Sequence, residues 1–237
     1  EFLAPYGPDL RNGLTNHAPM AVEALAALGR ADAIMPWLEH YSKSMLSRPV
    51  ARERITPENW GVLLGKTERV ADWNVFFENE LKEYPWREVL ARWTERLAPG
   101  FCASAMHGII RAGHAVRSLS ESDTPARIRE LADGLGYWAA AYQTLPTAQN
   151  IARSLPAQAA ITKVPIVPLA QRKFSGTIVS SLEALEGFSD FAPVIGLLDG
   201  TRDPTQTISD MSETFTRVYL ANAHDVLSTI VFIHSVT

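Results

Sequence analysis

Two histidines on one predicted helix are the residues best placed to do chemistry together. His107 and His114 stand seven positions apart in an uninterrupted helical pattern. Seven residues are close to two helical turns, so both rings leave the same face, about 10.5 Å apart along the axis. Imidazole binds metal ions and exchanges protons near neutral pH. The spacing is compatible with one ion shared by both rings, and equally with two core histidines bonded to backbone carbonyls.

Two further histidines lie in apolar surroundings. His17 stands at the start of a predicted helix, and His234 follows the most apolar run of the chain. A buried imidazole without a partner costs desolvation free energy, so each ring needs a hydrogen bond or a metal. Three or four imidazoles inside an α-helical bundle fit an iron, zinc or manganese site on facing helices.

The other two histidines are weaker candidates. His40 lies among polar residues and is expected to be exposed. His224 precedes Asp225 and lies about 80° away from the helix face of His234. A His-Asp pair is also typical of metal phosphohydrolases, whose remaining ligands cannot be assigned here, so a metal hydrolase stays a weaker alternative. Glu23 or Asp225 is expected to orient a ligand imidazole.

Four more side chains are candidate substrate contacts. Arg111 and Arg117 each lie within one turn of a candidate histidine and are placed to orient a substrate oxyanion, or else to form ion pairs on the surface. Trp138 and Tyr142 are one turn apart and are placed to line a substrate pocket, although packing in the core explains tryptophans on apolar faces more simply.

Nucleotide chemistry has little support in the sequence. Residues 61–67 imitate a phosphate-binding loop, but the loop is one residue short and follows no predicted strand. No Gly-x-Gly-x-x-Gly follows a strand, so neither a Rossmann nor a flavin motif is seen. Cys102 is the only cysteine, and we expect a packed thiol there.

The elements that must position these residues are almost all helices. The apolar residues recur with helical period through nearly the whole chain, while strand-like alternation is almost absent. We therefore predict an all-α fold, a single helical-bundle-like domain of roughly ten helices over residues 1–237. The predicted helices span residues 15–28, 31–46, 56–64, 70–81, 85–97, 102–119, 124–142, 177–185, 191–198 and 204–233.

Composition excludes several other classes of protein. The 237 residues are 46% hydrophobic, a fraction typical of a globular chain, and carry a formal net charge of −4. Mild acidity without a basic run argues against nucleic-acid binding, and no stretch of about 18 apolar residues predicts a membrane span. A single thiol and no leader-like start favour the cytoplasm. The apolar end of the chain suggests a missing C-terminal segment, and its exposed surface suggests a homodimer.

Several short motifs together resemble the questin oxidase-like family. They keep a consistent order from near the N-terminus to the C-terminus, and they occupy residues 14–20, 97–100, 107–111, 114–117, 130–132, 136–139 and 232–237. The resemblance implies an α-helical enzyme that oxidises an aromatic polyketide, such as an anthraquinone or a related phenol, by Baeyer–Villiger-type ring opening. It further implies a non-haem iron centre whose ligand set is His17, His107, His114 and His234. Longer members continue past the last motif.

Our leading interpretation is therefore a non-haem iron oxygenase that uses Fe(II), O₂ and a small aromatic substrate. A second hypothesis keeps the family and replaces the metal by NADPH, as some fungal members are described, although the nucleotide fingerprint is missing. A third is a non-catalytic helical module that binds an apolar ligand and whose histidines are only structural. Metal content separates the first hypothesis from the other two, because neither of them requires an ion.

Overall fold

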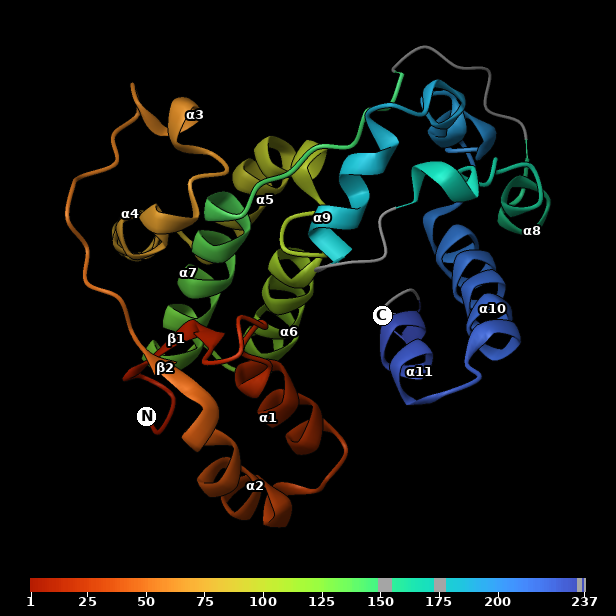
Figure 1. The fold of residues 1–237 in the computed structure, drawn as a ribbon. Helices are drawn as coiled ribbons and strands as arrows, with labels where there is room; N and C mark the ends of the chain where they lie inside the picture. The colour runs from red at the N-terminus through yellow and green to blue at the C-terminus, as the bar shows by residue number, and fades with distance from the viewer. Residues whose placement is uncertain (149–154, 173–177, 234–235, 237) are drawn as a thin grey trace. The chain divides into compact units, whose positions relative to one another are not determined.

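The computed structural model describes residues 1–148, 155–172, 178–233 and 236 (Figure 1). It is mostly helical, with one small two-stranded sheet in the described residues, so the predicted all-α fold is confirmed. Contacts divide the chain into two compact units, Glu1–Thr144 and Leu145–Thr237. The expectation of one domain stays a prediction, because a division by packing does not measure independent folding.

The first unit contains seven α-helices and the sheet. The strands β1 (Tyr6–Leu10) and β2 (Met45–Ser47) pair antiparallel, with Tyr6 opposite Ser47 and Leu10 opposite Met45. The helices are α1 (Ala18–Ala27), α2 (Ile34–Tyr41), α3 (Trp60–Leu63), α4 (Val70–Glu83), α5 (Trp86–Leu97), α6 (His107–Glu121) and α7 (Pro125–Ala140). The predicted helix over residues 31–46 therefore extends too far, because its last residues pair with β1 instead.

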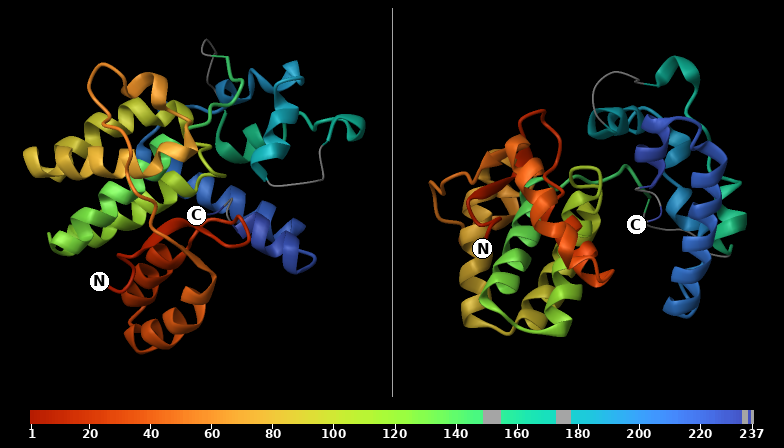
Figure 2. Two further views of the ribbon diagram at one scale, coloured as in Figure 1. Left: turned by 60° about the vertical axis from the view of Figure 1, so that its left-hand side comes forward. Right: turned by 90° about the horizontal axis from the view of Figure 1, so that it is seen from below.

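The core of this unit is built around α7. Helix α7 packs against α4 and α6, and α1 packs against α6 (Figures 1 and 2). Trp73, Phe77 and Trp93 form an aromatic cluster in which Trp93 stands edge-on to Phe77 at 4.9 Å between ring centroids. Edge-to-face aromatic packing adds to the free energy gained by removing apolar area from water. A rigid core therefore holds the helices that carry most of the candidate residues.

Helices α6 and α7 lie close together because small residues separate them. A Cβ atom built on Gly108 would be 2.6 Å from the Cα of Trp138, a distance that real Cβ atoms essentially never show. Gly113, in the same helix, has nothing within 4 Å of the corresponding position. One glycine of α6 is therefore required by packing, and the other is not.

This contrast predicts opposite effects for the same substitution. Gly108→Ala should lower the free energy of unfolding by about 1–3 kcal/mol, because the added methyl group overpacks the contact with the α7 backbone. Gly113→Ala should raise it by about 0.8–1 kcal/mol, because alanine is the better helix former. Urea unfolding of the two variants and the parent protein measures both changes. Equal effects of the two substitutions would contradict this account of the interface.

In its described residues the second unit contains four α-helices besides short 3₁₀ turns. They are α8 (Ala157–Ile161), α9 (Ile178–Leu182), α10 (Pro204–Asn222) and α11 (Val226–Ile233). The prediction of one continuous helix over residues 204–233 is wrong, because the chain breaks before α11. The Ser228 hydroxyl accepts hydrogen bonds from the backbone N–H groups of His224 and Asp225, and the Asp225 carboxylate accepts one from the N–H of Ser228. This reciprocal capping starts a new helix.

No helix in the described part of the chain is long and apolar enough to cross a membrane.

Candidate functional site

His17 and His107 come together at the N-terminal ends of two packed helices. His17 is the residue just before α1, and His107 is the first residue of α6. Their Nε2 atoms are 2.9 Å apart, and the two rings stand at 88° with their centroids 4.7 Å apart. The two residues are ninety positions apart in the sequence, and the packing of α1 on α6 brings them together.

Backbone carbonyls fix the orientation of both rings. The Nδ1 atom of His17 is 2.8 Å from the carbonyl oxygen of Thr15, and the Nδ1 atom of His107 is 2.7 Å from that of Ser104. A carbonyl oxygen only accepts hydrogen bonds, so each Nδ1 must carry a proton. In a neutral ring the Nε2 atom then holds a lone pair, and here two such lone pairs face each other. The arrangement is stable only when a cation, either a proton or a metal ion, lies between them.

A left-handed turn places the Ser104 carbonyl under His107. Ser104, Ala105 and Met106 have φ values of 49°, 54° and 68°. Three consecutive non-glycine residues in this region carry conformational strain, which persists only where the surrounding structure imposes it. The predicted start of this helix at residue 102 is therefore wrong: the helix begins at His107, and the turn before it is part of the site.

Three hydroxyl groups connect the residues that hold the two imidazoles. The Tyr137 hydroxyl is 2.9 Å from Thr15 Oγ1 and 2.6 Å from Ser104 Oγ. Tyr137 is buried in α7, and burial raises the pKa of its phenol. Tyr137 therefore joins the two segments whose carbonyls orient His17 and His107. Sequence reasoning did not single it out, because a tyrosine in an apolar helix gives no signal of its hydroxyl partners.

His114 is paired with a carboxylate from α1. Its Nδ1 atom is 2.6 Å from Oε2 of Glu23, and Arg117 donates hydrogen bonds to both oxygens of the same carboxylate. Burial alone would raise the pKa of Glu23, but the hydrogen bonds from Arg117 and His114 outweigh it and lower that pKa below its ordinary value. Glu23 thus orients the imidazole of His114, and Arg117 is held by Glu23.

Arg111 is buried in an ion-pair network. Its guanidinium donates to both oxygens of Glu130, at 2.6 and 3.0 Å, and lies 3.6 Å from Asp133. Arg48 donates to both oxygens of Asp133 as well. Arg111 was expected to contact substrate or to lie on the surface. It is instead 6% exposed, and its guanidinium is paired with carboxylates of α7.

Trp138 and Tyr142 have packing partners in the first unit. Trp138 is 2% exposed, and its indole N–H donates to the carbonyl of Gly100 at 3.1 Å. The ring of Tyr142 covers Gly100, where a Cβ atom would be 2.2 Å from the tyrosine ring. Neither residue lines either of the two cavities described below.

The other candidate ligands are not brought to the pair of His17 and His107 within the described part of the chain. His234 lies outside the described residues, and the carboxylate of Asp225 caps α11. His40 is exposed, as expected. Within the described ranges no group of three or more His, Cys, Asp and Glu side chains lies close enough to hold one metal ion. The structure therefore brings His17 and His107 together and places His114 with Glu23 instead.

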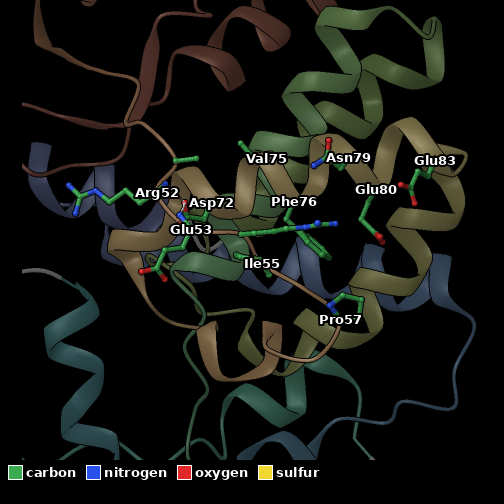
Figure 3. Close-up of a pocket in the computed structure, with 12 residues that line it drawn as sticks. Arg52, Glu53, Ile55, Pro57, Asp72, Val75, Phe76, Asn79, Glu80 and Glu83 are labelled. Atoms are coloured by element: carbon green, nitrogen blue, oxygen red, sulfur yellow. Dashed lines mark hydrogen bonds between the residues drawn. The ribbon is translucent and has the colours of Figure 1, made fainter.

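Two cavities lie within the first unit. One has a volume of about 880 Å³, opens to solvent, and is lined by residues of α1, α2, α6, α7 and the N-terminal segment; His114, Glu23 and Arg111 are among them. The other, of about 480 Å³, lies between residues 51–57 and α4 (Figure 3). In the smaller cavity, the Asp72 carboxylate accepts hydrogen bonds from the backbone N–H groups of Arg52 and Glu53. The larger cavity is the one that contains candidate residues.

A family model described as Questin oxidase-like matches residues 14–224, which is most of the chain. The chain belongs to the questin oxidase-like family. No match to a curated protein or to a solved structure was found. Membership makes this questin oxidase-like protein an oxidoreductase of the oxidase or oxygenase type, acting on polyketide-type substrates. The matched region contains the imidazole pair and His114 with its carboxylate.

Proposed function

We propose that this questin oxidase-like protein is a non-haem iron oxygenase that oxidises an aromatic polyketide or related phenol with O₂. The observation that carries the proposal is the pair of facing Nε2 atoms of His17 and His107, 2.9 Å apart, with both Nδ1 atoms turned to carbonyl oxygens. Both rings thereby direct Nε2 to the same point in space.

The distance between the two Nε2 atoms supports a shared metal ion. Two imidazole nitrogens bound at right angles to one ion, each at 2.0–2.1 Å, would be roughly 2.8–3.0 Å apart. Imidazole suits iron and zinc alike, and a metal-bound histidine commonly donates its other N–H to a carbonyl or carboxylate. His17 and His107 would hold the ion, and His234 completes the proposed set on the ground of its apolar sequence context.

Bound Fe(II) would supply the electrons and the open positions that O₂ chemistry requires. The residues of the chain itself hold the two imidazoles in one tautomer through the carbonyls of Thr15 and Ser104. Tyr137 ties these two carbonyl-bearing segments together, so the rings keep their orientation. Such positioning reduces the reorganisation that binding and reaction would otherwise demand.

Metal analysis and oxygen uptake test the proposal together. Protein purified without a His tag or chelator, and reconstituted anaerobically with Fe(II), should contain about one iron per chain by elemental analysis. It should then consume O₂ only when an anthraquinone or a related phenol is present. NADPH-dependent consumption by iron-free protein would instead favour the metal-independent alternative. Absence of bound metal, with no change in thermal stability on adding Fe(II), would overturn the proposal.

Tyr137 offers a milder test of the same site. Tyr137→Phe removes the hydroxyl that contacts Thr15 and Ser104, and should weaken Fe(II) affinity by about 10–100-fold, as the loss of a group that orients metal ligands usually does. Competition with a coloured chelator measures the affinity. Tyr84→Phe is the matched control, because Tyr84 is 42% exposed. Equal affinities of the two variants would show that the hydroxyl bridge does not support the site.

A further inference from the structure

The 880 Å³ cavity presents a carboxylate–imidazole pair to its interior. His114 and Glu23 both line it, and their Nδ1 and Oε2 atoms are 2.6 Å apart. The ring comes from the middle of α6 and the carboxylate from α1, so the pair spans the interface between two packed helices. The side chains of His114 and Glu23 are 26% and 13% exposed, which leaves the imidazole open to a small molecule but mostly shielded from water.

The hydrogen bond to Glu23 determines which nitrogen of His114 faces a ligand. Glu23 is ionised at neutral pH and accepts only, so His114 Nδ1 carries the proton and Nε2 keeps its lone pair. Arg117 cannot accept a hydrogen bond, and it reinforces the carboxylate instead. A carboxylate that holds one ring nitrogen protonated also stabilises the imidazolium formed when the other nitrogen takes a proton.

The rest of the cavity is lined by both apolar and charged side chains. Its volume lies within the range of roughly 300–1,000 Å³ that is usual for small-molecule sites. Apolar side chains from α1, α2 and the N-terminal segment line one side, among them Val22, Ile34 and Phe2. Arg111 and Glu130, which also line it, are bonded to each other. Further charged side chains line the cavity, among them Glu121, Arg127 and Arg129, so it combines an apolar side with polar groups that include the oriented imidazole of His114.

We propose that this cavity binds an aromatic compound through a hydroxyl group that donates a hydrogen bond to His114 Nε2, and that His114 acts as the base for that hydroxyl. The O–H bond breaks, the proton passes to Nε2, and the products are a phenolate and an imidazolium paired with Glu23. No electrons are transferred. The choice of a phenol as ligand rests on the proposed function, whereas the choice of this cavity and of His114 as the base rests on the geometry. His114 is thereby a base and not a metal ligand.

Binding of p-nitrophenol to the iron-free full-length chain tests this inference. Its phenolate is yellow, so absorbance difference titration reports binding and ionisation together. The parent protein should bind the probe with an increase in the phenolate band. His114→Gln and Glu23→Gln should each weaken binding at least roughly tenfold, because a hydrogen bond to a charged pair is lost. His40→Gln makes the same change at an exposed histidine and should bind like the parent.

Iron content of the same variants separates this inference from the proposed function. His107→Ala should lose iron and still bind p-nitrophenol, whereas His114→Gln should keep iron and lose the probe. Unaltered probe binding by His114→Gln, no binding by the parent, or loss of iron from His114→Gln would each overturn the inference. A parent protein that binds the probe through His114 but takes up no iron would overturn the proposed function alone.

Discussion

His107→Ala is expected to abolish both iron binding and substrate-dependent O₂ uptake. His107 and His17 direct their Nε2 atoms to one point, so removing either ring leaves an incomplete site. Loss of a residue that merely orients a metal ligand weakens affinity by about 10–100-fold, so loss of a ligand itself should exceed a hundredfold. Elemental analysis after anaerobic reconstitution measures the iron, and an oxygen electrode measures the uptake.

Thermal unfolding provides the control for this substitution. An ion bound only by the native state raises the melting temperature, so Fe(II) should stabilise the parent protein and leave His107→Ala unchanged. Circular dichroism should show that the variant remains helical, because His107 is the first residue of α6 and the substitution leaves the rest of that helix unchanged. His40→Ala, at an exposed position, should bind iron normally. A full complement of iron in His107→Ala would refute the metal site.

The helical architecture was accessible from the sequence, and the ends of its helices were less so. The predicted starts of the helices over residues 124–142 and 204–233 agree with the structure, where Thr124 and Asp203 precede prolines and each side chain accepts a backbone hydrogen bond from the first turn. The start of α6 was misplaced because apolar spacing cannot reveal that Ser104 to Met106 adopt left-handed backbone conformations. The break before α11 depends on Ser228, whose capping role is local and easily missed within an apolar run.

The candidate site was predictable in its residue types and not in its pairings. Helical periodicity correctly marks His107 and His114 as members of one helix, but it cannot say which other helix packs against each. Helix α1 meets α6 so that His17 reaches His107 while Glu23, about two turns along, reaches His114. The seven-residue separation of His107 and His114, which suggested that both bind one ion, is also the separation of two successive contacts between α1 and α6. Only tertiary packing distinguishes these outcomes.

Arg111 illustrates the same limit, because its exposure could not be read from its neighbours in the sequence. It lies within one turn of both helical histidines, which suggested a role toward substrate. In the structure its guanidinium is bonded to Glu130, so its main contribution is expected to be to stability. The burial of a charged residue on a polar-looking helix depends on which residues of α7 face it.

Arg111→Met should therefore destabilise the protein strongly. It removes the cation from Glu130, whose side chain is 26% exposed, and leaves a largely buried carboxylate without its partner. Breaking one side of a buried ion pair costs about 3–5 kcal/mol, and the partial exposure of Glu130 places the expected loss at the lower end, about 3 kcal/mol. Arg30→Met is the control in the same unit: the side chains of its ion pair with Asp32 are 62% and 72% exposed, so its loss should stay below about 1 kcal/mol.

The pH dependence identifies the carboxylate responsible. Burial raises the pKa of Glu130 above its ordinary value even though Arg111 opposes the shift, and removing Arg111 should raise that pKa further. Above the ordinary pKa of glutamate the unfolded chain then binds fewer protons than the folded one, so the stability of Arg111→Met falls as pH rises through this interval. In urea unfolding, the difference in free energy of unfolding between Arg111→Met and the parent protein should become smaller as the pH falls toward about 4.5. A difference in the free energy of unfolding that stayed constant with pH, or that became smaller to the same extent in Arg30→Met, would mean that Glu130 is not the group left unpaired.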